Sequence, residues 1–201
     1  MDYNSYMITV GVDEVGRGCW AGPLVAGAVV LPADFRQEDC PLRLRDSKKL
    51  SKIQREILAA WIHTHAPTVG LGWVWPGEID KHGLTWAVRT AMERALAEVT
   101  APYDEIIIDG NVNYLKEEHM LKHMTKTMVH ADDIVPSVSA ASIVAKVARD
   151  TYMAELGEDY AGYGFDKHVG YGTAAHIAAL TQLGVSDIHR LSYKPIKALL
   201  V

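Results

Sequence analysis

The stretch Asp13-Glu14-Val15-Gly16-Arg17-Gly18 places two adjacent acids directly after the apolar, β-branched run Tyr6 to Val12. A second such run, Leu24 to Leu31, follows a glycine-rich segment, so we expect two strands joined by a turn. Because side chains alternate between the faces of a strand, the two acids could share a ligand only where the strand ends and the longer glutamate swings back. The glycines let backbone atoms approach a ligand closely, and the arginine could meet a phosphate. An isolated Asp-Glu pair is more typical of a solvated strand end before a turn.

Strand and helix patterns alternate downstream of these runs, without a linker or an internal repeat. The expected strands are 68–75 and 105–108, and the expected helices are 51–66, 84–99, 138–155 and 173–183. Ser51 and Gln54 have the form of a capping box at the start of the first helix. The helix at 138–155 is rich in small residues, which permit close packing.

Two further acidic positions lie where sheet elements should end. Asp109 directly follows the strand 105–108, and the pair Asp132-Asp133 precedes the helix 138–155. Taken singly, Asp109 could be a turn residue and Asp132 an acid favoured by a helix dipole. Together with residues 13 and 14 they indicate a metal site, because clustered carboxylates are the ligands that Mg²⁺ and Mn²⁺ prefer. Two such ions about 3.5–4 Å apart can activate water and stabilise the leaving oxygen in phosphodiester hydrolysis.

The composition is that of an ordinary globular protein, with 201 residues of which 49% are hydrophobic and 22% charged. The net charge of −5 argues against a protein that coats nucleic acid, although cations bound at a carboxylate site would make the working surface more positive. Cys19 and Cys40 lie in no zinc-binding spacing, and we expect buried free thiols. The N-terminus does not have the pattern of a signal peptide, and the apolar runs are far shorter than the ~20 residues of a membrane span. We therefore expect a cytoplasmic protein with no membrane partner.

Four motifs make the chain similar to one family. They are Asp13 to Gly18, Asp46-Ser47-Lys48-Lys49-Leu50, Ala140-Ala141-Ser142-Ile143-Val144-Ala145-Lys146 and Tyr163-Gly164-Phe165. In type and order they resemble the motifs of ribonuclease HII, and they span nearly the whole chain. The resemblance implies an α/β, ribonuclease H-like mixed β-sheet flanked by helices, with a small helical C-terminal region. We expect a catalytic domain at 1–155 and a loop-rich, helical region at 156–201 that contributes to the substrate groove, the two forming a single compact unit.

The resemblance also implies an activity and its ligands. The implied enzyme hydrolyses the RNA strand of RNA–DNA hybrids and cuts on the 5′ side of ribonucleotides embedded in duplex DNA, leaving 3′-hydroxyl and 5′-phosphate ends. Its role would be ribonucleotide removal from DNA. Two Mg²⁺ or Mn²⁺ ions would be held by Asp13, Glu14, Asp109 and one acid of the Asp132-Asp133 pair. In the family this acid lies seven residues before the block that begins here at Ser139, which selects Asp132. We expect a monomer whose partner is the nucleic acid, and a protein partner stays open.

Substrate-reading residues follow from the same resemblance. The family recognises the 2′-hydroxyl of a ribonucleotide through backbone atoms of a Gly-Arg-Gly segment and through a tyrosine, which correspond here to Gly16, Arg17, Gly18 and Tyr171. A 2′-hydroxyl both donates and accepts a hydrogen bond and distinguishes RNA from DNA at one nucleotide. From the residues alone, Tyr171 could equally cover the core. Lys48 is implied as a phosphate contact, although a lysine near a helix start is usually solvated.

Other residues have a less specific pattern. Lys146 and Arg149 could lie under the nucleic acid, although Lys146 could instead pair with Asp150 on the same helix. His168 is either a proton shuttle or a residue that supports the loop. At Val169 and Leu191 the family commonly has basic residues, so we expect weaker phosphate contact with unchanged chemistry.

Three alternatives compete with this assignment. Ribonuclease HIII carries an additional N-terminal substrate-binding domain, for which we expect no room ahead of Asp13. Another two-metal nuclease or strand-transfer protein of the same fold is disfavoured by the Gly-Arg-Gly segment and Tyr171. A binding protein that has lost catalysis agrees with the acidic net charge and the missing basic residues. However, four retained carboxylates would repel phosphate unless cations filled the cluster.

Overall fold

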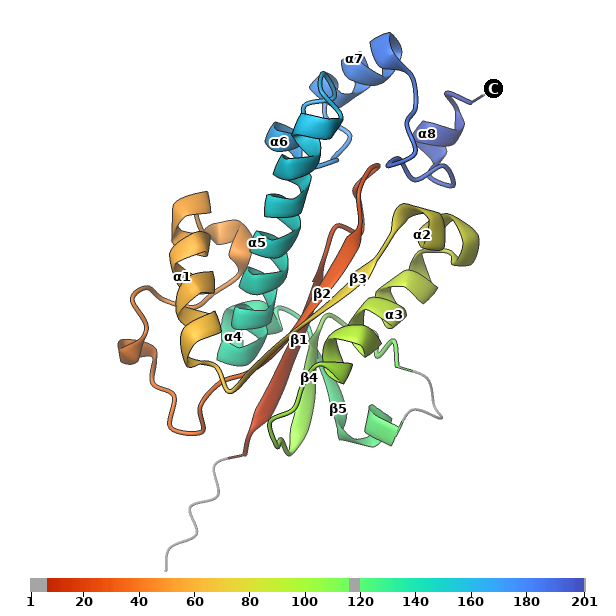
Figure 1. The fold of residues 1–201 in the computed structure, drawn as a ribbon. Helices are drawn as coiled ribbons and strands as arrows, with labels where there is room; N and C mark the ends of the chain where they lie inside the picture. Colours follow the sequence, from red (N-terminus) through yellow and green to blue (C-terminus); the bar gives the residue numbers. More distant parts are fainter. Residues whose placement is uncertain (1–6, 116–119, 201) are drawn as a thin grey trace, which may run out of the picture.

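The computed structural model describes residues 7–115 and 120–200, and in this part of the chain the strands form one five-stranded sheet (Figure 1). The strand order is β3-β2-β1-β4-β5. The strands are β1 Thr9–Val15, β2 Leu24–Val30, β3 Thr68–Val74, β4 Glu105–Asp109 and β5 Thr125–Met128. The first three strands pair in antiparallel fashion, whereas β4 runs parallel to both β1 and β5. The sheet is therefore mixed, as the sequence predicts.

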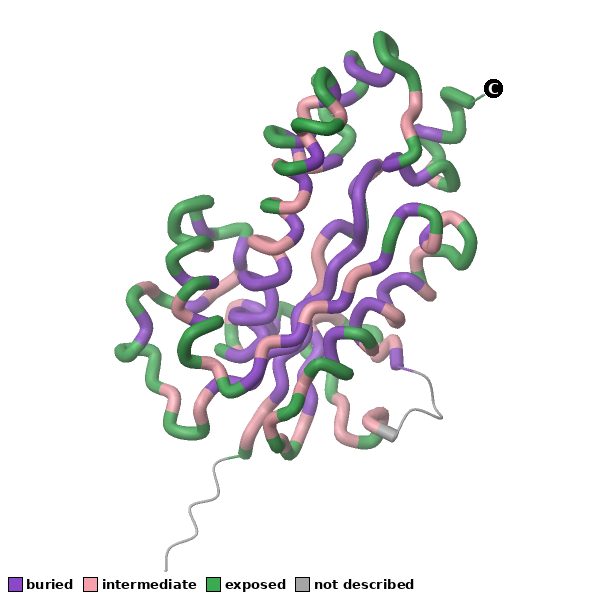
Figure 2. Tube along the Cα trace, in the orientation of Figure 1, coloured by how far each residue is buried: buried purple, intermediate pink, exposed green. Residues whose placement is uncertain are grey.

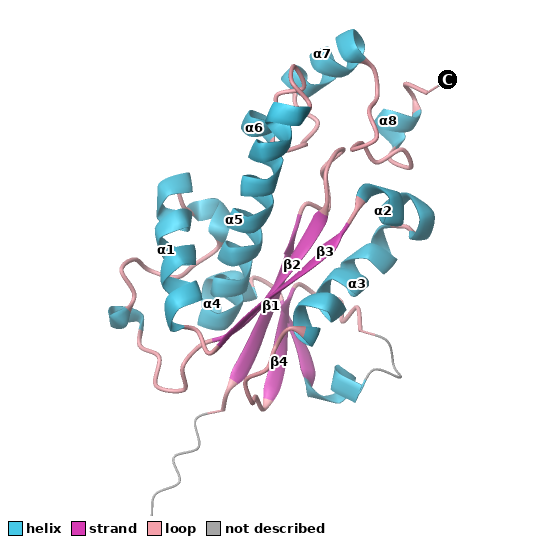
Figure 3. Ribbon diagram, viewed as in Figure 1, coloured by secondary structure: helices cyan, strands magenta, loops and turns pink. Residues whose placement is uncertain are grey.

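Helices cover both faces of this sheet (Figures 1 and 3). The α-helices are α1 Lys52–His65, α2 Pro76–His82, α3 Leu84–Ala97, α4 Ala131–Ile134, α5 Pro136–Asp159, α6 Phe165–His168, α7 Ala174–Leu183 and α8 Lys194–Lys197. The short 3₁₀ helices are η1 Gln37–Asp39, η2 Ser47–Lys49 and η3 Met120–Met124. Helices α1 and α5 lie on one side of the sheet and α2 and α3 on the other (Figure 1). In Figure 2 the buried residues follow the strands and the sides of α3 and α5 that face them.

Glycines in the strands let the two main helices approach the sheet closely. A Cβ atom at Gly11 of β1 would lie 2.1 Å from the backbone of Ser137 in α5. On the opposite face, a Cβ at Gly72 of β3 would lie 1.9 Å from the carbonyl oxygen of Ala91 in α3. Any side chain at these positions would overlap helix backbone, so α5 lies directly on β1. This contact sets the distance between the acids of β1 and the side chains of α5.

The structure corrects the position of the first strand. β1 begins at Thr9 and continues through both acids to Val15, because the antiparallel ladder with β2 pairs Asp13 with Gly27 and Glu14 with Ala26. The acids therefore lie inside a paired strand, not beyond its end. Alternation then places their side chains on opposite faces of the sheet.

The sequence also does not predict strand β5, and the remaining differences concern helices. A separate helix, α2, precedes α3 and is not predicted from the sequence. Pro76 begins it, the Glu78 side chain accepts a hydrogen bond of 3.0 Å from the backbone N–H of Trp75, and Gly83 at φ +83° ends it. Helix α5 is also longer than the predicted range 138–155, so it crosses the expected domain boundary at residue 155 without interruption.

The upper part of α5 leaves the sheet and packs with α6 and α7 (Figure 1). This region has its own apolar cluster, whose buried members include Ala21, Met153, Phe165, Leu180 and Ile196. Cys19 and Cys40 are both buried and unpaired, as expected. Within residues 7–115 and 120–200, no helix combines the length and apolar character that crossing a membrane requires.

Candidate active site

Asp13 projects from β1 toward α5. Its side chain is 7% exposed, and one carboxylate oxygen accepts a hydrogen bond of 2.7 Å from the backbone N–H of Glu14. The hydroxyl of Ser142 on α5 lies close enough to this carboxylate to lower its pKa and is 2.9 Å from the hydroxyl of Ser47 in η2. Ser142 lies in one of the quoted motifs, but only the packing of α5 on β1 brings it to Asp13.

Glu14 follows Asp13 on β1, and its carboxylate pairs with the guanidinium of Arg17. Their ion pair measures 3.0 Å, and the second guanidinium nitrogen of Arg17 donates a hydrogen bond of 3.2 Å to the Tyr114 hydroxyl. The guanidinium carbon also lies 5.8 Å from the centre of the Tyr114 ring. Tyr114 belongs to no motif in the sequence. It reaches Arg17 only because the loop after β4 folds back toward β1.

Asp109 and Asp132 come from neighbouring elements and lie near one another. Asp109 ends β4, and its carboxylate accepts a hydrogen bond of 2.8 Å from the backbone N–H of Ala131, the first residue of α4. Asp132 is 6% exposed, and its carbonyl oxygen accepts a hydrogen bond of 2.6 Å from the hydroxyl of Ser139. The adjacent Asp133 instead forms an ion pair with Lys49 and accepts a hydrogen bond from the backbone N–H of Asp46.

The four acids Asp13, Glu14, Asp109 and Asp132 influence one another electrostatically. Burial, followed by the charge of Glu14, raises the pKa of Asp13 well above its usual value, and Asp109 adds to this effect. Burial also raises the pKa of Glu14, where the charge of Asp109 acts in the same direction and Arg17 opposes it. Burial and then Asp109 raise the pKa of Asp132 to about 6. Asp109 thus repels all three of the other carboxylates.

A cluster of mutually repelling carboxylates has the donor chemistry that a hard divalent cation requires. As the side chains are placed here, however, no three Asp, Glu, His or Cys residues of the described chain stand close enough to bind one metal ion. The Glu14 carboxylate is turned toward Arg17 and the Asp109 carboxylate toward the N–H of Ala131. The carboxylates therefore have the chemistry that such a cation requires. For three of them to bind one ion at once, the side chains of Glu14 and Asp109 would have to rotate away from their present partners.

A hollow of about 220 Å³ opens beside Asp13 and Glu14 and contains several of the predicted substrate contacts. Its remaining lining residues are Val15, Ser47, Lys48, Ser142, Lys146 and Tyr171. Lys48 also lies close enough to Asp132 to lower its pKa in opposition to the neighbouring acids. Lys146 forms the alternative ion pair with Asp150, at 2.8 Å, and its ammonium nitrogen lies 6.0 Å from the centre of the Tyr171 ring.

The Gly-Arg-Gly segment lies beside Tyr171. A Cβ at Gly18 would lie 4.0 Å from a ring carbon of Tyr171, and Gly16 adopts φ +91°, a conformation that favours glycine. Tyr171 is 38% exposed, and burial of the rest of the ring raises the pKa of its hydroxyl to about 12. The phenol is therefore neutral at physiological pH. The structure thus brings the predicted ribose-reading residues together at the mouth of the acidic hollow.

Two buried arginines donate hydrogen bonds to the backbone in and next to this segment. Arg149 is fully buried and donates hydrogen bonds of 2.8 to 3.1 Å to the carbonyl oxygens of Ala21, Pro23 and Val169. Arg190 is also fully buried and donates to the carbonyl oxygens of Gly22 and Arg17. The suggestion that Arg149 lies under the nucleic acid is therefore wrong. Its guanidinium is enclosed, because three carbonyl groups of the surrounding loops converge on it.

His168 does not have the position of a proton shuttle either. Its ring is buried, with one nitrogen 2.7 Å from the carbonyl oxygen of Tyr163 and the other accepting from the backbone N–H of Gly170. Both ring nitrogens are thus occupied by backbone groups. The contacts favour the alternative, a residue that supports the loop.

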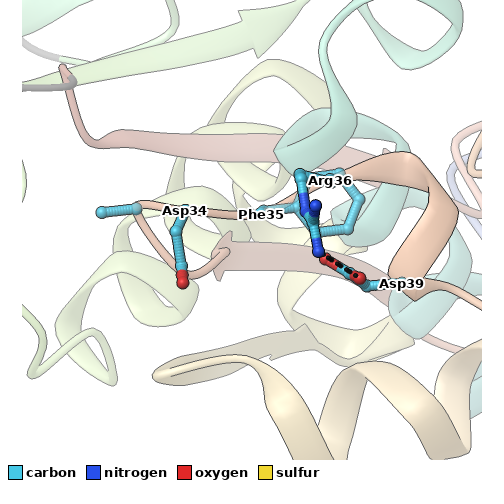
Figure 4. Close-up of a pocket in the computed structure, with 5 residues that line it drawn as sticks. Asp34, Phe35, Arg36 and Asp39 are labelled. Carbon is cyan, nitrogen blue, oxygen red and sulfur yellow. Dashed lines mark hydrogen bonds and ion pairs between the residues drawn. The ribbon is translucent and has the colours of Figure 1, made fainter.

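A larger hollow, of about 420 Å³, lies in the loop that contains Phe35 (Figure 4). It is lined by Ala33, Asp34, Phe35, Arg36 and Asp39. Arg36 forms ion pairs with Asp39 at 3.1 Å and with Glu38 at 3.0 Å, so its charge is matched within the loop. None of the predicted site residues lines this hollow, and the acidic hollow beside β1 is the candidate site.

Comparisons of sequence point to one family, and comparisons of structure to its fold. The family model for ribonuclease HII matches residues 10–196. Ribonuclease HII of Dichelobacter nodosus (strain VCS1703A) is 46% identical over 190 residues, which cover 94% of this chain and 96% of that protein. Among solved structures, ribonuclease H2 from Pyrococcus horikoshii OT3 superposes with a TM-score of 0.78 at 28% identity, covering 96% of this chain and 97% of that one. Bst-RNase HIII, solved in complex with Mn²⁺, shares the fold with a TM-score of 0.73 at 20% identity, covering 97% of this chain and 70% of that one.

Proposed function

Because the chain belongs to the ribonuclease HII family, and is thereby a hydrolytic endoribonuclease with the ribonuclease H-like fold, we propose that it cuts both RNA–DNA hybrids and duplex DNA that contains single ribonucleotides. Cleavage falls on the 5′ side of the ribonucleotide and leaves 3′-hydroxyl and 5′-phosphate ends, which serves ribonucleotide removal from DNA. One observation carries the proposal: Tyr171 lines the same hollow as Asp13 and Glu14. A residue suited to reading a sugar thus lies beside the acids suited to cutting the adjoining phosphodiester bond.

Asp13, Glu14, Asp109 and Asp132 would hold Mg²⁺ or Mn²⁺, two ions in the working site. The raised pKa values of Asp13, Glu14 and Asp132 support this assignment, because a bound cation would offset both the burial and the repulsion that raise them. When bound, such ions supply the positive charge that activates water and stabilises the phosphate during hydrolysis. Ser142 orients the Asp13 carboxylate, and the N–H of Ala131 orients that of Asp109.

Basic side chains around the acids would hold the nucleic acid. Lys48 lines the hollow next to the acids, and Arg17 lies beside Glu14, so both can meet phosphates next to the bond that is cut. The Tyr171 ring can pack on the adjoining sugar, and backbone groups of Gly16 to Gly18 can read the 2′-hydroxyl. Residues 156–201 contribute to the groove through Tyr171 and through the contact of Arg190 with the Arg17 carbonyl. A monomeric state and a cytoplasmic location stay predictions from the sequence.

A cleavage assay with three substrates tests this function. The protein is incubated with duplex DNA containing one ribonucleotide, with an all-DNA duplex and with an RNA–DNA hybrid, each in Mg²⁺, Mn²⁺ or EDTA. We expect cleavage of the first and third substrates in either metal and none in EDTA, and we expect the all-DNA duplex to stay intact. Asp109→Asn should abolish cleavage, whereas the control Asp39→Asn, which changes the loop around Arg36, should not.

Each competing interpretation has its own outcome. Cleavage that survives EDTA would contradict the metal mechanism, and cleavage of the all-DNA duplex would contradict ribose selection. Binding of the hybrid without cleavage in either metal would instead favour a protein that has kept the fold and lost catalysis.

A further inference from the structure

Three buried histidines form a cluster that contacts the backbone of Tyr171 through His168 and His176. His168 ends α6, His176 lies in the first turn of α7, and His189 follows in the loop before α8. The His168 and His176 rings stack with their centres 4.5 Å apart, and the centres of His176 and His189 are 5.3 Å apart. His176 and His189 are fully buried. The mechanism above uses none of them.

The hydrogen bonds of this cluster determine where each proton lies. A ring nitrogen of His176, Nδ1, is 3.0 Å from the carbonyl oxygen of Tyr171, and a carbonyl only accepts, so Nδ1 carries the hydrogen. The other nitrogen, Nε2, must then accept from Nε2 of His189 at 3.0 Å. Nδ1 of His189 in turn accepts from the backbone N–H and the hydroxyl of Ser186, at 3.1 and 2.8 Å, whereas the longer contact of 3.3 Å with the Ser186 carbonyl oxygen carries no hydrogen in this arrangement. All three of these links form with neutral imidazoles and with one set of tautomers.

This chain of hydrogen bonds ends on the backbone of Tyr171. The Tyr171 carbonyl also accepts from the N–H of Thr173 at 2.8 Å, and the Tyr171 N–H donates to the carbonyl of His168 at 2.9 Å. Val169, two residues before Tyr171, adopts φ +44°, where a β-branched residue is rarely found. The loop before Tyr171 therefore depends on its contacts to keep this conformation, and the histidines supply several of them.

We propose that His176, oriented by His189, is a positioning residue that sets the placement of Tyr171 and thereby the selectivity for a ribonucleotide. The inference rests on the proposed role of Tyr171 in reading the sugar. His176 touches neither the acids nor the hollow, so its effect has to pass through the Tyr171 backbone. Loss of the Nδ1–H donor should loosen the tyrosine without changing the four carboxylates.

The matched variants separate this hydrogen bond from the bulk of the ring. His176→Phe keeps a ring that can stack on His168 but removes both nitrogens, whereas His176→Asn keeps an N–H near the position of Nδ1. His65→Phe is the control, because His65 also stacks on an aromatic ring and bonds a carbonyl through Nδ1, but on α1, outside the hollow's lining. On duplex DNA with one ribonucleotide, we expect His176→Phe to lower kcat/KM about three- to tenfold, mainly by raising KM. His176→Asn should stay within about twofold of the wild type, and His65→Phe should not differ from it.

A double-mutant cycle with Tyr171→Ala decides whether the effect passes through the tyrosine. If His176 acts by positioning Tyr171, His176→Phe should lower kcat/KM in the wild-type background and have almost no further effect in Tyr171→Ala. An equal loss in both backgrounds, or a loss with His176→Asn as large as with His176→Phe, would overturn the inference. So would the absence of any effect of His176→Phe.

The same experiment separates the two proposals. A wild-type protein that does not cleave the ribonucleotide substrate refutes the proposed function, and Tyr171→Ala with unchanged kinetics refutes the role of the tyrosine and the inference together. An additive cycle refutes the positioning role alone. Should His176→Phe fail to fold, as judged by circular dichroism, His189→Phe replaces it in the cycle, since it removes the links of His189 to His176 and to Ser186 but keeps the His176 ring.

Discussion

Asp132 and Asp133 are adjacent, yet the structure predicts opposite consequences for their replacement by asparagine. Asp132 is buried near Asp109, and its pKa is raised to about 6 by burial and by the neighbouring negative charges. Asp133 forms an ion pair with Lys49, which lowers its pKa. We therefore expect Asp132→Asn to stabilise the metal-free protein while abolishing cleavage. Asp133→Asn should instead destabilise the protein slightly and leave cleavage intact.

The magnitude for Asp132 follows from its pKa. A pKa raised from 3.8 to about 6 corresponds to at most about 3 kcal/mol of destabilisation of the folded state once the group is charged. Screening by solvent reduces this to about 1–1.5 kcal/mol. Because the folded protein binds this proton more tightly than the unfolded chain does, the penalty is absent below pH 3.8, grows as the pH rises, and is complete above about pH 6. Removing the charge should therefore add stability at pH 8 and almost none at pH 4.

Urea unfolding in EDTA at pH 8 and pH 4, paired with the cleavage assay in Mg²⁺ and Mn²⁺, measures both effects. The loss of one ligand should cost several kcal/mol of transition-state stabilisation, a decrease in rate of at least about 100-fold. If Asp133→Asn abolished cleavage and Asp132→Asn retained it, the choice between the two acids would be wrong. If Asp132→Asn lowered stability at pH 8, the electrostatic explanation would fail instead.

Two further predictions concern the residues behind the site. Arg149→Met leaves three buried carbonyl groups without their donor, so it should lower the free energy of unfolding by about 3 kcal/mol or more. Urea titrations measure this loss, and the exposed control Arg36→Met should change the free energy of unfolding little. A loss below about 1 kcal/mol for Arg149→Met would contradict this account. His176 has a pKa lowered from 6.5 to about 4 by burial, so its contribution to stability should be complete above pH 6.5 and should be lost as the pH falls to about 4. Urea unfolding at pH 7.5 and 4.5 should show this loss, at about 1–2 kcal/mol after solvent screening, in the wild type and not in His176→Asn.

Much of the fold is predictable because its signals are local. The apolar run before Asp13, the alternation of strands and helices and the small residues of α5 are visible within short windows, and the structure confirms both this alternation and the mixed sheet that the family resemblance implies. Helix α2 is missed because its seven residues are too few for a periodic pattern, and its limits depend on Pro76 and Gly83. The end of β1 is misjudged because pairing with β2, not the apolar pattern, determines where that strand stops.

For the site, the sequence alone determined the kinds of residues and their order along the chain: the acids, the Gly-Arg-Gly segment and the motifs that resemble those of ribonuclease HII. Which side chains face one another depends on how the chain folds. The tertiary structure separates Asp132 from Asp133 and encloses Arg149 among carbonyl groups up to 128 residues away. The physical reason is that residue type and spacing record local geometry, whereas burial, ion pairing and the orientation of a histidine depend on segments that meet only when the chain has folded.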